Sequence, residues 1–550
     1  MKLIHTLFLV SILAFAGQAF AVPAEGHKLM VAGPSPYAVE TARKILAKGG
    51  NVADVTVAVA LTLAVTSPYY AALGGGGFAM IKMDGPVQAL DFRDTAPAAA
   101  GKDYFKDTPE NTSLTGGKAT GVPGIPAGLW ALHQKYGKLK WLQLFEPALE
   151  LAAKGFQVSG EWHKVTVEEK SRFTDLARGI FFKKDMSAYR PGDIFKQPEL
   201  AKALHELRTK NMKGFYEGPV AEDIVKSLAE SGGQMTLDDL KNYKVRWLQP
   251  LTADFEGYKI YLMPPPSSGG VVIATALGLM DRLKLRDKPM NSVDEWHYLA
   301  EIEARAFRGR SQLGDPGFNK NPVAYLTSGA YLDELAKSVN PKQTSYLAPL
   351  TANELPKERP ETTHFSVMDA EGHAIAMTIT LNGSYGSGVV SRKFGIAFNN
   401  GMDDFTTKPG VANQYGLIQG DANSVQPGKR PLSSMSPTLV EKDGKIVMSL
   451  GSPGGPRIIT GVLQVLYRAL AQKMDIDQAL QMPRVHHQFM PSKLYLEPKR
   501  FAPETIEALK ARKHIVEESG GGKVYAVRLR PDGILEGAFD MRGEGAAGGQ

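Results

Sequence analysis

Two adjacent threonines, Thr362 and Thr363, begin a stretch whose pattern predicts two strands joined by a tight turn at Glu371-Gly372. A threonine hydroxyl is a weak nucleophile at neutral pH and needs a neighbouring base. The α-amino group of the same residue can be that base once the chain is cut before it. The stretch therefore predicts either a plain hairpin or a hairpin whose first residue becomes an N-terminal nucleophile.

Three runs of small and polar residues follow this stretch: NNGMDDF at 399–405, KRPLSSMSPT at 429–438 and GSPGGPR at 451–457. Runs of this kind lie at strand ends and turns, where sites are usually built. The third run precedes a long amphipathic helix expected from Ile458 to about Lys473. A glycine-rich turn entering a helix presents backbone N–H groups with the helix dipole behind them, which suits an oxyanion.

Arg93 follows an expected strand, 87–92, in the run DFRDTAP. An arginine there is most often a surface charge, but at a strand end near a glycine-rich turn its guanidinium can bind a carboxylate through two hydrogen bonds. His364, His486 and His487 are interpreted as structural, because a histidine pair without a third ligand is weak evidence for a metal site.

Composition narrows the chemistry further. The 550 residues carry a net charge of only +7 and no long Lys/Arg run, so a nucleic-acid partner is not expected. The absence of cysteine excludes a thiol nucleophile, a thiolate metal site and disulfides. Any nucleophile is then expected to be an oxygen.

Residues 1–21 have the form of a secretory signal, with a basic start at Lys2, an apolar run at 7–15 and a small-x-small cleavage site ending at Ala21. We expect a mature chain that begins at Val22 and is exported, to the periplasm in the first place, with secretion to the medium as the alternative. The apolar run is shorter than the roughly 20 residues that a bilayer span needs, which disfavours a retained membrane anchor.

The elements that must position these residues fall into a helical part and a strand-rich part. The length exceeds one ordinary core, so two domains or one large layered domain are expected. The expected elements are helices within 37–66, from 127 to about 243, from 271 and at 294–307; hairpins at 78–92 and 438–450; a strand at 258–266; an exposed linker at about 344–361; and three or four strands within 362–400.

The sequence resembles the γ-glutamyltransferases (glutathione hydrolases) of the N-terminal nucleophile hydrolase superfamily over nearly the whole mature chain. Any one of the shared motifs is weak evidence, but ten in family order are strong evidence. They are GGN at 49–51, LGGGGF at 73–78, DFR at 91–93, PPPSSGG at 264–270, TTHFSV at 362–367, TLN at 380–382, NNxMDDF at 399–405, GDAN at 420–423, KRPLSSMSPT at 429–438 and GSPGG at 451–455.

The resemblance implies an α+β fold, a four-layer αββα sandwich, without a metal or an organic cofactor. It implies that Thr362 attacks the carbonyl of Glu361 and cuts the precursor into a large subunit, 22–361, and a small subunit, 362–550, which remain a heterodimer. Thr362 would then attack glutathione and other γ-glutamyl compounds and form a γ-glutamyl ester. Water or the amine of an amino acid or dipeptide acceptor would take the acyl group.

The same resemblance implies roles for the remaining motif residues. Thr380 would hydrogen-bond the nucleophile, and the N–H groups of Gly454 and Gly455 would form the oxyanion hole. Tyr415 would be the gate of a lid at 409–420 over a small closed pocket.

The substrate's α-amino acid end would be held by two groups of side chains. Arg93, Ser433 and Ser434 would bind the α-carboxylate, and Asn382 and Asp404 would bind the α-amino group. Taken alone, the serine pair is also typical of a turn, and Asp404 of a helix or turn cap.

Gly401 departs from the family, which has Gln or Glu there to help bind the α-amino group. The missing acceptor should weaken binding by about 1–3 kcal/mol unless water or another group replaces it. This departure motivates one alternative, an acylase for glutaryl-type amides. Two others do not depend on Gly401: a non-catalytic secreted binding protein, and cleavage one bond later with Thr363 as the nucleophile. The family pattern favours Thr362 over Thr363.

Overall fold

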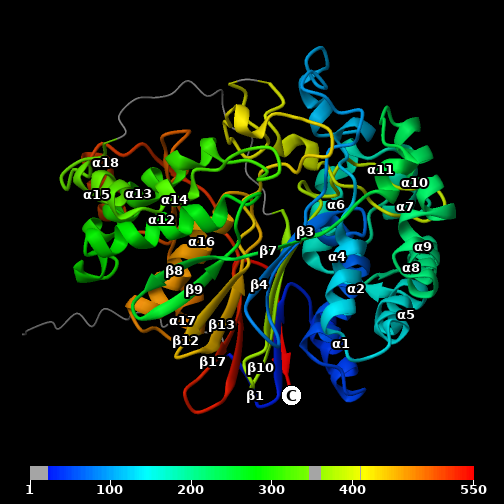
Figure 1. Ribbon diagram of the computed structural model, residues 1–550, viewed down its shortest axis with the longest axis horizontal. Helices are drawn as coiled ribbons and strands as arrows, with labels where there is room; N and C mark the ends of the chain where they lie inside the picture. The colour runs from blue at the N-terminus through cyan, green and yellow to red at the C-terminus, as the bar shows by residue number, and fades with distance from the viewer. Residues whose placement is uncertain (1–22, 346–360, 409) are drawn as a thin grey trace, which may run out of the picture.

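Two seven-stranded antiparallel sheets lie face to face in the computed structural model, and helices cover the outer face of each (Figure 1). The structure describes residues 23–345, 361–408 and 410–550. The expected four-layer αββα sandwich is confirmed. The signal at 1–21 and most of the expected linker, 346–360, lie outside the described residues.

Both sheets combine strands from before and after Thr362. Chains 22–361 and 362–550, if separated, would therefore share each sheet. The first sheet has the order β1 (Ala24–Gly26), β18 (Leu535–Phe539), β17 (Tyr525–Leu529), β13 (Lys445–Gly451), β12 (Thr438–Lys442), β9 (Tyr258–Leu262), β8 (Leu251–Phe255). The second has the order β19 (Ala546–Gly549), β2 (Leu29–Gly33), β10 (Thr363–Asp369), β11 (Ala374–Thr380), β3 (Gly76–Lys82), β4 (Gln88–Phe92), β7 (Arg246–Leu248).

Apolar side chains fill the space between the two sheets, with Met30 and Phe78 from the second sheet against Leu439 and Val527 from the first. Separate apolar clusters lie between each sheet and its helices. Both faces of β10 and β11 are therefore covered, and all residues of β11 are buried. Burial on both sides holds the start of β10 and the end of β11 in a fixed position.

Two groups of helices form the outer layers. The layer on the second sheet contains α1 (Pro36–Ala47), α2 (Val52–Thr66), α3 (Pro68–Ala71), α4 (Ile125–Tyr136), α5 (Glu146–Lys154), α6 (Gly160–Glu169), α7 (Asp175–Phe181), α8 (Pro198–Lys210), α9 (Lys213–Tyr216), α10 (Gly218–Glu230) and α11 (Leu237–Lys241). The layer on the first contains α12 (Gly269–Arg282), α13 (Val293–Arg308), α14 (Val323–Leu326), α15 (Gly329–Lys337), α16 (Arg457–Leu466), α17 (Ile476–Gln481) and α18 (Pro503–Ala511). No helix among the described residues is long and apolar enough to cross a membrane.

Short strands lie outside the two large sheets. They form one pair and one three-stranded sheet: β5 (Phe156–Gln157) with β6 (Ile194–Phe195), and β14 (Val485–His486), β15 (Leu494–Leu496) and β16 (Val516–Glu518).

One expectation about elements was wrong and another needs a refinement. Within 362–400 only β10 and β11 form, because the rest contains turns in which Gly386 and Gly388 have φ angles of 52° and 72°. The helix expected from Ile458 to about Lys473 is confirmed, from Arg457 to Ala471, but its last turn, Tyr467–Ala471, is π-helical rather than α-helical. In that turn Arg468 forms an ion pair with the buried Glu295 of α13.

Candidate active site

Thr362 lies immediately before β10, and Thr380 is the last residue of the neighbouring strand β11. The register pairs Thr363 with Ile379, which brings the two strand ends together. The hydroxyl oxygens of Thr362 and Thr380 are 3.0 Å apart. Of the two adjacent threonines, Thr362 is the one whose hydroxyl contacts Thr380.

The backbone at Thr362 is strained. Its φ of 87° is unusual for a β-branched residue and costs about 1–3 kcal/mol, so the surrounding structure must hold it there. The carbonyl oxygen of the preceding residue, Glu361, accepts a hydrogen bond of 2.8 Å from the N–H of Gly454. Gly454 itself has a φ of 114°, a conformation that glycine adopts readily. The carbonyl before Thr362 thus lies on the glycine turn that the sequence predicts as an oxyanion hole.

One small cavity, of about 20 Å³, collects most of the predicted site residues. They are Arg93, Thr362, Thr380, Asn382, Asp404, Tyr415, Ser433, Ser434 and Gly455. Glu361 and Gly454 meet beside it through their backbone hydrogen bond. The structure therefore brings together residues from six separate motifs and from the segment 410–420.

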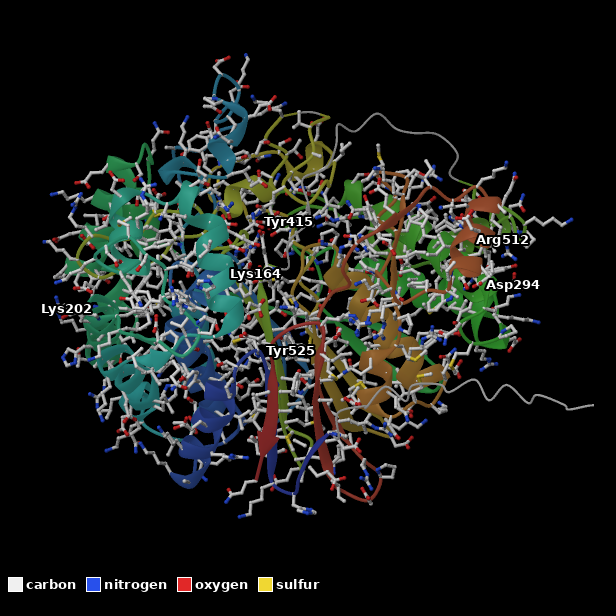
Figure 2. The ribbon with its side chains drawn as sticks, turned by 180° about the vertical axis from the view of Figure 1, so that it is seen from behind. Lys164, Lys202, Asp294, Tyr415, Arg512 and Tyr525 are labelled. Atoms are coloured by element: carbon white, nitrogen blue, oxygen red, sulfur yellow. The ribbon has the colours of Figure 1, made fainter. Side chains whose placement is uncertain are left out.

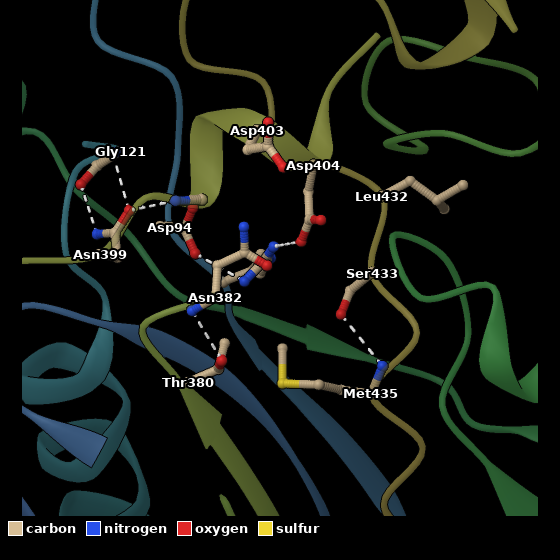
Figure 3. Close-up of polar contacts among 12 residues, drawn as sticks. Asp94, Gly121, Thr380, Asn382, Asn399, Asp403, Asp404, Leu432, Ser433 and Met435 are labelled. Atoms are coloured by element: carbon tan, nitrogen blue, oxygen red, sulfur yellow. Dashed lines mark hydrogen bonds and ion pairs between the residues drawn. The ribbon is translucent and has the colours of Figure 1, made fainter. Parts of the chain in front are cut away.

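Arg93 is directed at carboxylates rather than at the two serines. Its guanidinium forms ion pairs with Asp404 and with Asp94, the latter at 3.0 Å, and is almost fully buried (Figure 3). Ser433 Oγ accepts a hydrogen bond from the N–H of Met435 at 3.1 Å. The guanidinium and the serine hydroxyls nonetheless line the same cavity, so a carboxylate bound there would meet both.

Asp404 ends a short 3₁₀ turn, Gly401–Asp404, that holds it over the cavity. Its Oδ1 accepts a hydrogen bond of 3.1 Å from Asn413 Nδ2. Burial raises the pKa of Asp404 to about 7; the Arg93 charge opposes this shift and the Asp403 and Asp94 carboxylates add to it. Asn382, with a φ of 72°, donates from Nδ2 to the carbonyl of Asn400 at 3.0 Å.

Tyr415, the residue expected to be the gate of a lid, lines the cavity and lies at the upper end of the central sheets (Figure 2). Its hydroxyl is 2.7 Å from the carbonyl oxygen of Asn382 and 3.0 Å from Glu361 Oε2. Its ring packs on Gly455, where a Cβ would lie 2.6 Å from Tyr415 Cδ1. Burial also raises the pKa of Glu361 to about 7. The described lid segment, 410–420, excludes Pro409.

Two further charged residues were missed, one that lines the cavity and one that pairs with Arg93. Arg310, on the 3₁₀ turn Gly309–Gln312, lines the cavity and donates to Ser268 Oγ and Gln419 Oε1, both at 3.1 Å. Asp94 follows Arg93 in the chain and pairs with it. No sequence pattern marks Arg310, which lies in a helical region. Asp94 could have been recognised, because it stands next to the oppositely charged Arg93 in the run DFRD.

The three histidines are buried, and burial lowers their pKa, to about 3 for His364 and about 4 for His487. They are neutral at pH 7. His364 is hydrogen-bonded to the hydroxyls of Thr378 and Ser366, at 2.8 and 3.1 Å, and does not bond Thr362. The base for Thr362 must therefore come from elsewhere.

The sequence profile of the γ-glutamyltranspeptidase family matches residues 38–550. The glutathione hydrolase proenzyme of Pseudomonas aeruginosa is 41% identical over 99% of this chain and 98% of its own length. The glutathione hydrolase proenzyme of Escherichia coli is 40% identical, over 94% and 91% of the two chains.

Solved structures agree in fold. A cephalosporin acylase from Bacillus halodurans superposes with a TM-score of 0.85 over 99% of this chain and all of its own, at 24% identity. The γ-glutamyltranspeptidase of Helicobacter pylori is 38% identical, with a TM-score of 0.55, and 91% of that solved chain matches 56% of this one.

Proposed function

This chain belongs to the γ-glutamyltranspeptidase family, and we propose that it is a self-processing γ-glutamyltransferase and glutathione hydrolase whose nucleophile is Thr362. One observation carries the assignment of the nucleophile. The Thr362 hydroxyl lies against Thr380, while the carbonyl next to it in the chain accepts the Gly454 N–H. These contacts support Thr362 as the nucleophile, the Glu361 carbonyl as the group it attacks and the Gly454 N–H as the oxyanion donor.

The first reaction is cleavage of the chain. Thr362 Oγ1 attacks the carbonyl carbon of Glu361, and the negative charge that develops on its oxygen is stabilised by the Gly454 N–H. Such a donor is typically worth about 3–4 kcal/mol. The C–N bond to Thr362 breaks, the nitrogen takes the proton, and an ester between Glu361 and the Thr362 hydroxyl remains. Water hydrolyses this ester and leaves a free α-amino group on Thr362.

The second reaction uses that amino group as the base. It takes the proton of Thr362 Oγ1 as the oxygen attacks the γ-carbonyl of a glutamyl substrate, and Thr380 holds the oxygen at 3.0 Å. The leaving amine departs protonated, and the γ-glutamyl group stays as an ester on Thr362. Water releases glutamate, or an amino acid or dipeptide amine takes the acyl group. Glutathione and other γ-glutamyl compounds are the donors.

The α-amino acid end of the substrate enters the small cavity. Arg93 and the hydroxyls of Ser433 and Ser434 bind its carboxylate, and Asp404 and Asn382 bind its ammonium group. Tyr415 covers the bound group and limits the site to small donors. The cavity's lining by these residues supports this placement.

The two products of cleavage, 22–361 and 362–550, stay together as a heterodimer. Support comes from the sheets, each of which would lose its order if either chain left. The relatives are called proenzymes, which accords with cleavage. The signal at 1–21 supports export, to the periplasm in the first place.

Intact-mass and N-terminal analysis of the purified protein, beside a Thr362→Ala variant, tests this proposal. We expect two chains, the smaller beginning at Thr362, and one uncut, inactive chain in the variant. A wild-type chain that stays whole would remove the base and favour the binding-protein alternative. A smaller chain beginning at Thr363 would move the nucleophile by one residue.

Hydrolysis of γ-glutamyl-p-nitroanilide and of glutaryl-p-nitroanilide separates the two enzymatic alternatives. We expect the γ-glutamyl amide to be preferred, because two acidic residues, Asp94 and Asp404, flank Arg93 and suit an ammonium group. A preference for the glutaryl amide would favour the acylase alternative. The likeness to a cephalosporin acylase concerns the fold alone and does not support that alternative.

A further inference from the structure

Asp94 has a buried carboxylate whose capacity to accept hydrogen bonds is unused. The residue has an exposed fraction of 0%, and neither oxygen accepts a hydrogen bond from the residues that the structure describes. Its ion pair there is with Arg93, with 3.0 Å between Nη1 and Oδ1. An ionised carboxylate has about four acceptor positions, and leaving them unfilled inside a protein is costly. Such a group calls for a donor that does not belong to the chain.

Asp94 also fills the space of a side chain that Gly401 lacks. A Cβ at position 401 would lie 1.9 Å from Asp94 Oδ2, which is far too close for any residue but glycine unless Asp94 moves. The backbone of Gly401 is fixed, because its N–H donates to Asn399 Oδ1 at 2.9 Å. The space of an acceptor side chain at 401 is thus occupied here by the carboxylate of Asp94.

We propose that Asp94, together with Asp404, binds the α-ammonium group of the γ-glutamyl donor; this inference rests on the function proposed above. The two carboxylates, both labelled in Figure 3, pair with different nitrogens of the Arg93 guanidinium: Asp94 with Nη1 and Asp404 with Nη2. The α-amino acid end of the donor carries one ammonium group and one carboxylate. When it binds, its ammonium group pairs with Asp94 and Asp404 in place of Arg93. Its carboxylate pairs with the guanidinium of Arg93.

This exchange of partners selects zwitterions. A glutaryl group has the carboxylate but no ammonium group, so turning Arg93 toward it would leave Asp94 and Asp404 without a cation. An unpaired charge in a buried site is strongly unfavourable. The carboxylate of Asp94 therefore acts as a specificity-determining group for the α-amino end of the donor.

The test compares kcat/KM for γ-glutamyl-p-nitroanilide and glutaryl-p-nitroanilide in wild type, Asp94→Asn and Asp54→Asn. Asp54 is a matched control: it is equally buried but caps α2 through Asn51 N–H, outside the site. We expect Asp94→Asn to lower the γ-glutamyl to glutaryl ratio by about 10- to 100-fold, the range for losing a charged hydrogen-bond partner. Asp54→Asn should leave the ratio unchanged.

An unchanged ratio in an active Asp94→Asn enzyme would overturn the inference and leave the proposed function intact. A wild type that prefers the glutaryl amide would overturn both. If Asp94→Asn does not fold, a crystal structure of the wild type with L-glutamate decides. An Asp94 oxygen at hydrogen-bond distance, about 3 Å, from the α-nitrogen supports the inference, and a distance above about 4 Å overturns it.

A second observation lies on the other side of the glycine turn. Gly455 lines the small cavity, whereas Gly454 lines a separate cavity of about 350 Å³. Four cationic side chains line this larger cavity and only one acidic side chain does: Arg457, Arg500, Lys523 and Arg542, with Glu497. Glu497 pairs with Arg542 and Lys523 pairs with Glu161, so the lining remains cationic overall.

Arg500 is the clearest of these cations, because the bond that the structure gives its guanidinium is to a neutral group, the backbone carbonyl of Gln481. In the proposed reaction the acyl part of the donor occupies the small cavity, on the Gly455 side of the turn. The larger cavity, on the Gly454 side, is then the space left for the leaving amine. Leaving groups and acceptors in the proposed reaction are amino acids and dipeptides, which carry a carboxylate. We infer that the cationic cavity binds this carboxylate; the inference rests on the proposed transfer reaction.

Transfer from γ-glutamyl-p-nitroanilide to glycylglycine and to glycylglycinamide tests it, with Arg500→Gln and, as a matched control, the exposed neighbour Lys499→Gln. We expect wild type to use the acid about tenfold better than the amide, and Arg500→Gln to remove most of that preference. Lys499→Gln should keep it. Release of p-nitroaniline without acceptor reports the proposed function separately.

Equal use of acid and amide by the wild type would overturn this second inference, as would an Arg500→Gln enzyme with the wild-type ratio. If that variant does not fold, the salt dependence of the wild type decides. Added salt should lower the rate of transfer to glycylglycine and leave the rate of transfer to glycylglycinamide unchanged. Salt screens the contact between the cationic cavity and the acceptor's carboxylate, which the amide lacks. An equal effect of salt on both acceptors contradicts the inference.

Discussion

The carboxyl of Glu361 and the hydroxyl of Tyr415 lie 3.0 Å apart in the uncut chain, and both groups are buried. The single hydroxyl proton of Tyr415 has two acceptors within reach, Glu361 Oε2 and, at 2.7 Å, the carbonyl of Asn382. A protonated Glu361 resolves the conflict, because it donates to Tyr415 while Tyr415 donates to Asn382. Burial supports this, since it raises the pKa of Glu361 to about 7.

Glu361→Gln should stabilise the uncut chain at high pH only. A carboxyl whose pKa is raised in the folded state binds its proton more tightly there than in the unfolded state. Stability from this group is therefore present at low pH and is lost as pH rises from the unfolded value, about 4.5, to about 7. The loss is on the order of 3 kcal/mol, and glutamine avoids it.

Urea unfolding of the Thr362→Ala chain, with and without Glu361→Gln, measures the effect at pH 5 and pH 8. We expect similar stabilities at pH 5 and a more stable Glu361→Gln chain at pH 8. Equal differences at both pH values would contradict a raised pKa at Glu361.

Thr380→Val should slow both chain cleavage and turnover. The Thr380 hydroxyl contacts Thr362 Oγ1 at 3.0 Å and accepts the N–H of Asn382 at 2.8 Å. Losing a bond to a group that becomes charged typically costs about 10- to 100-fold in rate. Thr380→Ser keeps the hydroxyl and should retain most of the activity.

Time courses of cleavage and of γ-glutamyl-p-nitroanilide hydrolysis measure these effects. Thr378→Val is the matched control, because Thr378 lies two residues earlier on β11 and its hydroxyl contacts His364 instead. A Thr380→Val enzyme no slower than Thr378→Val would mean that the 3.0 Å contact is only structural.

Strands and helices with a regular local pattern could be predicted from the sequence. Side-chain contacts between residues far apart in the chain could not. Strand alternation located β10 and β11, although their burial on both faces meant that alternation could not say which face carries the site. The family motifs identified most of the residues that line the cavity. They could not show that Arg93 pairs with Asp404, which is 311 residues away in the chain.

Charged residues in the helical part were the hardest to foresee. Arg310 reaches the cavity only because a 3₁₀ turn follows α13, and no local pattern marks it. The change from α-helix to π-helix after Leu466 was unforeseen for a related reason. The buried Glu295, which Arg468 meets in the π-helical turn, comes from a distant helix and is invisible to helical periodicity.

Arg430→Met should destabilise the loop that carries Ser433. Arg430 is buried and forms an ion pair with Asp91, which is also buried. Removing one partner leaves an uncompensated charge, which typically costs about 3–5 kcal/mol. Adding Asp91→Asn removes that charge while keeping the acceptor of the Arg93 N–H, so the double variant should recover part of the loss.

Urea unfolding of these variants in the uncut Thr362→Ala chain gives the comparison. Arg286→Met is the control, because the exposed guanidinium of Arg286 pairs with Glu256 at the surface, where a pair is worth about 0–1 kcal/mol. A double variant as unstable as Arg430→Met alone would mean that lost packing, and not the unpaired Asp91, causes the damage.

Recognition of the donor's ammonium group should weaken as pH falls below about 7. Burial raises the pKa of Asp404 to about 7, so its carboxylate becomes protonated in that range and can no longer pair with a cation. The α-amino base of Thr362 titrates nearby, at about 7.7–8.0 in unperturbed form, and affects every donor alike.

The ratio of kcat/KM for γ-glutamyl-p-nitroanilide over glutaryl-p-nitroanilide cancels that common effect. We expect this ratio to be level above pH 8 and to fall from pH 7 to pH 5, whereas in Asp404→Asn it should be low and independent of pH. A wild-type ratio that stays level down to pH 5 would mean that Asp404 remains ionised and that Arg93 outweighs its burial.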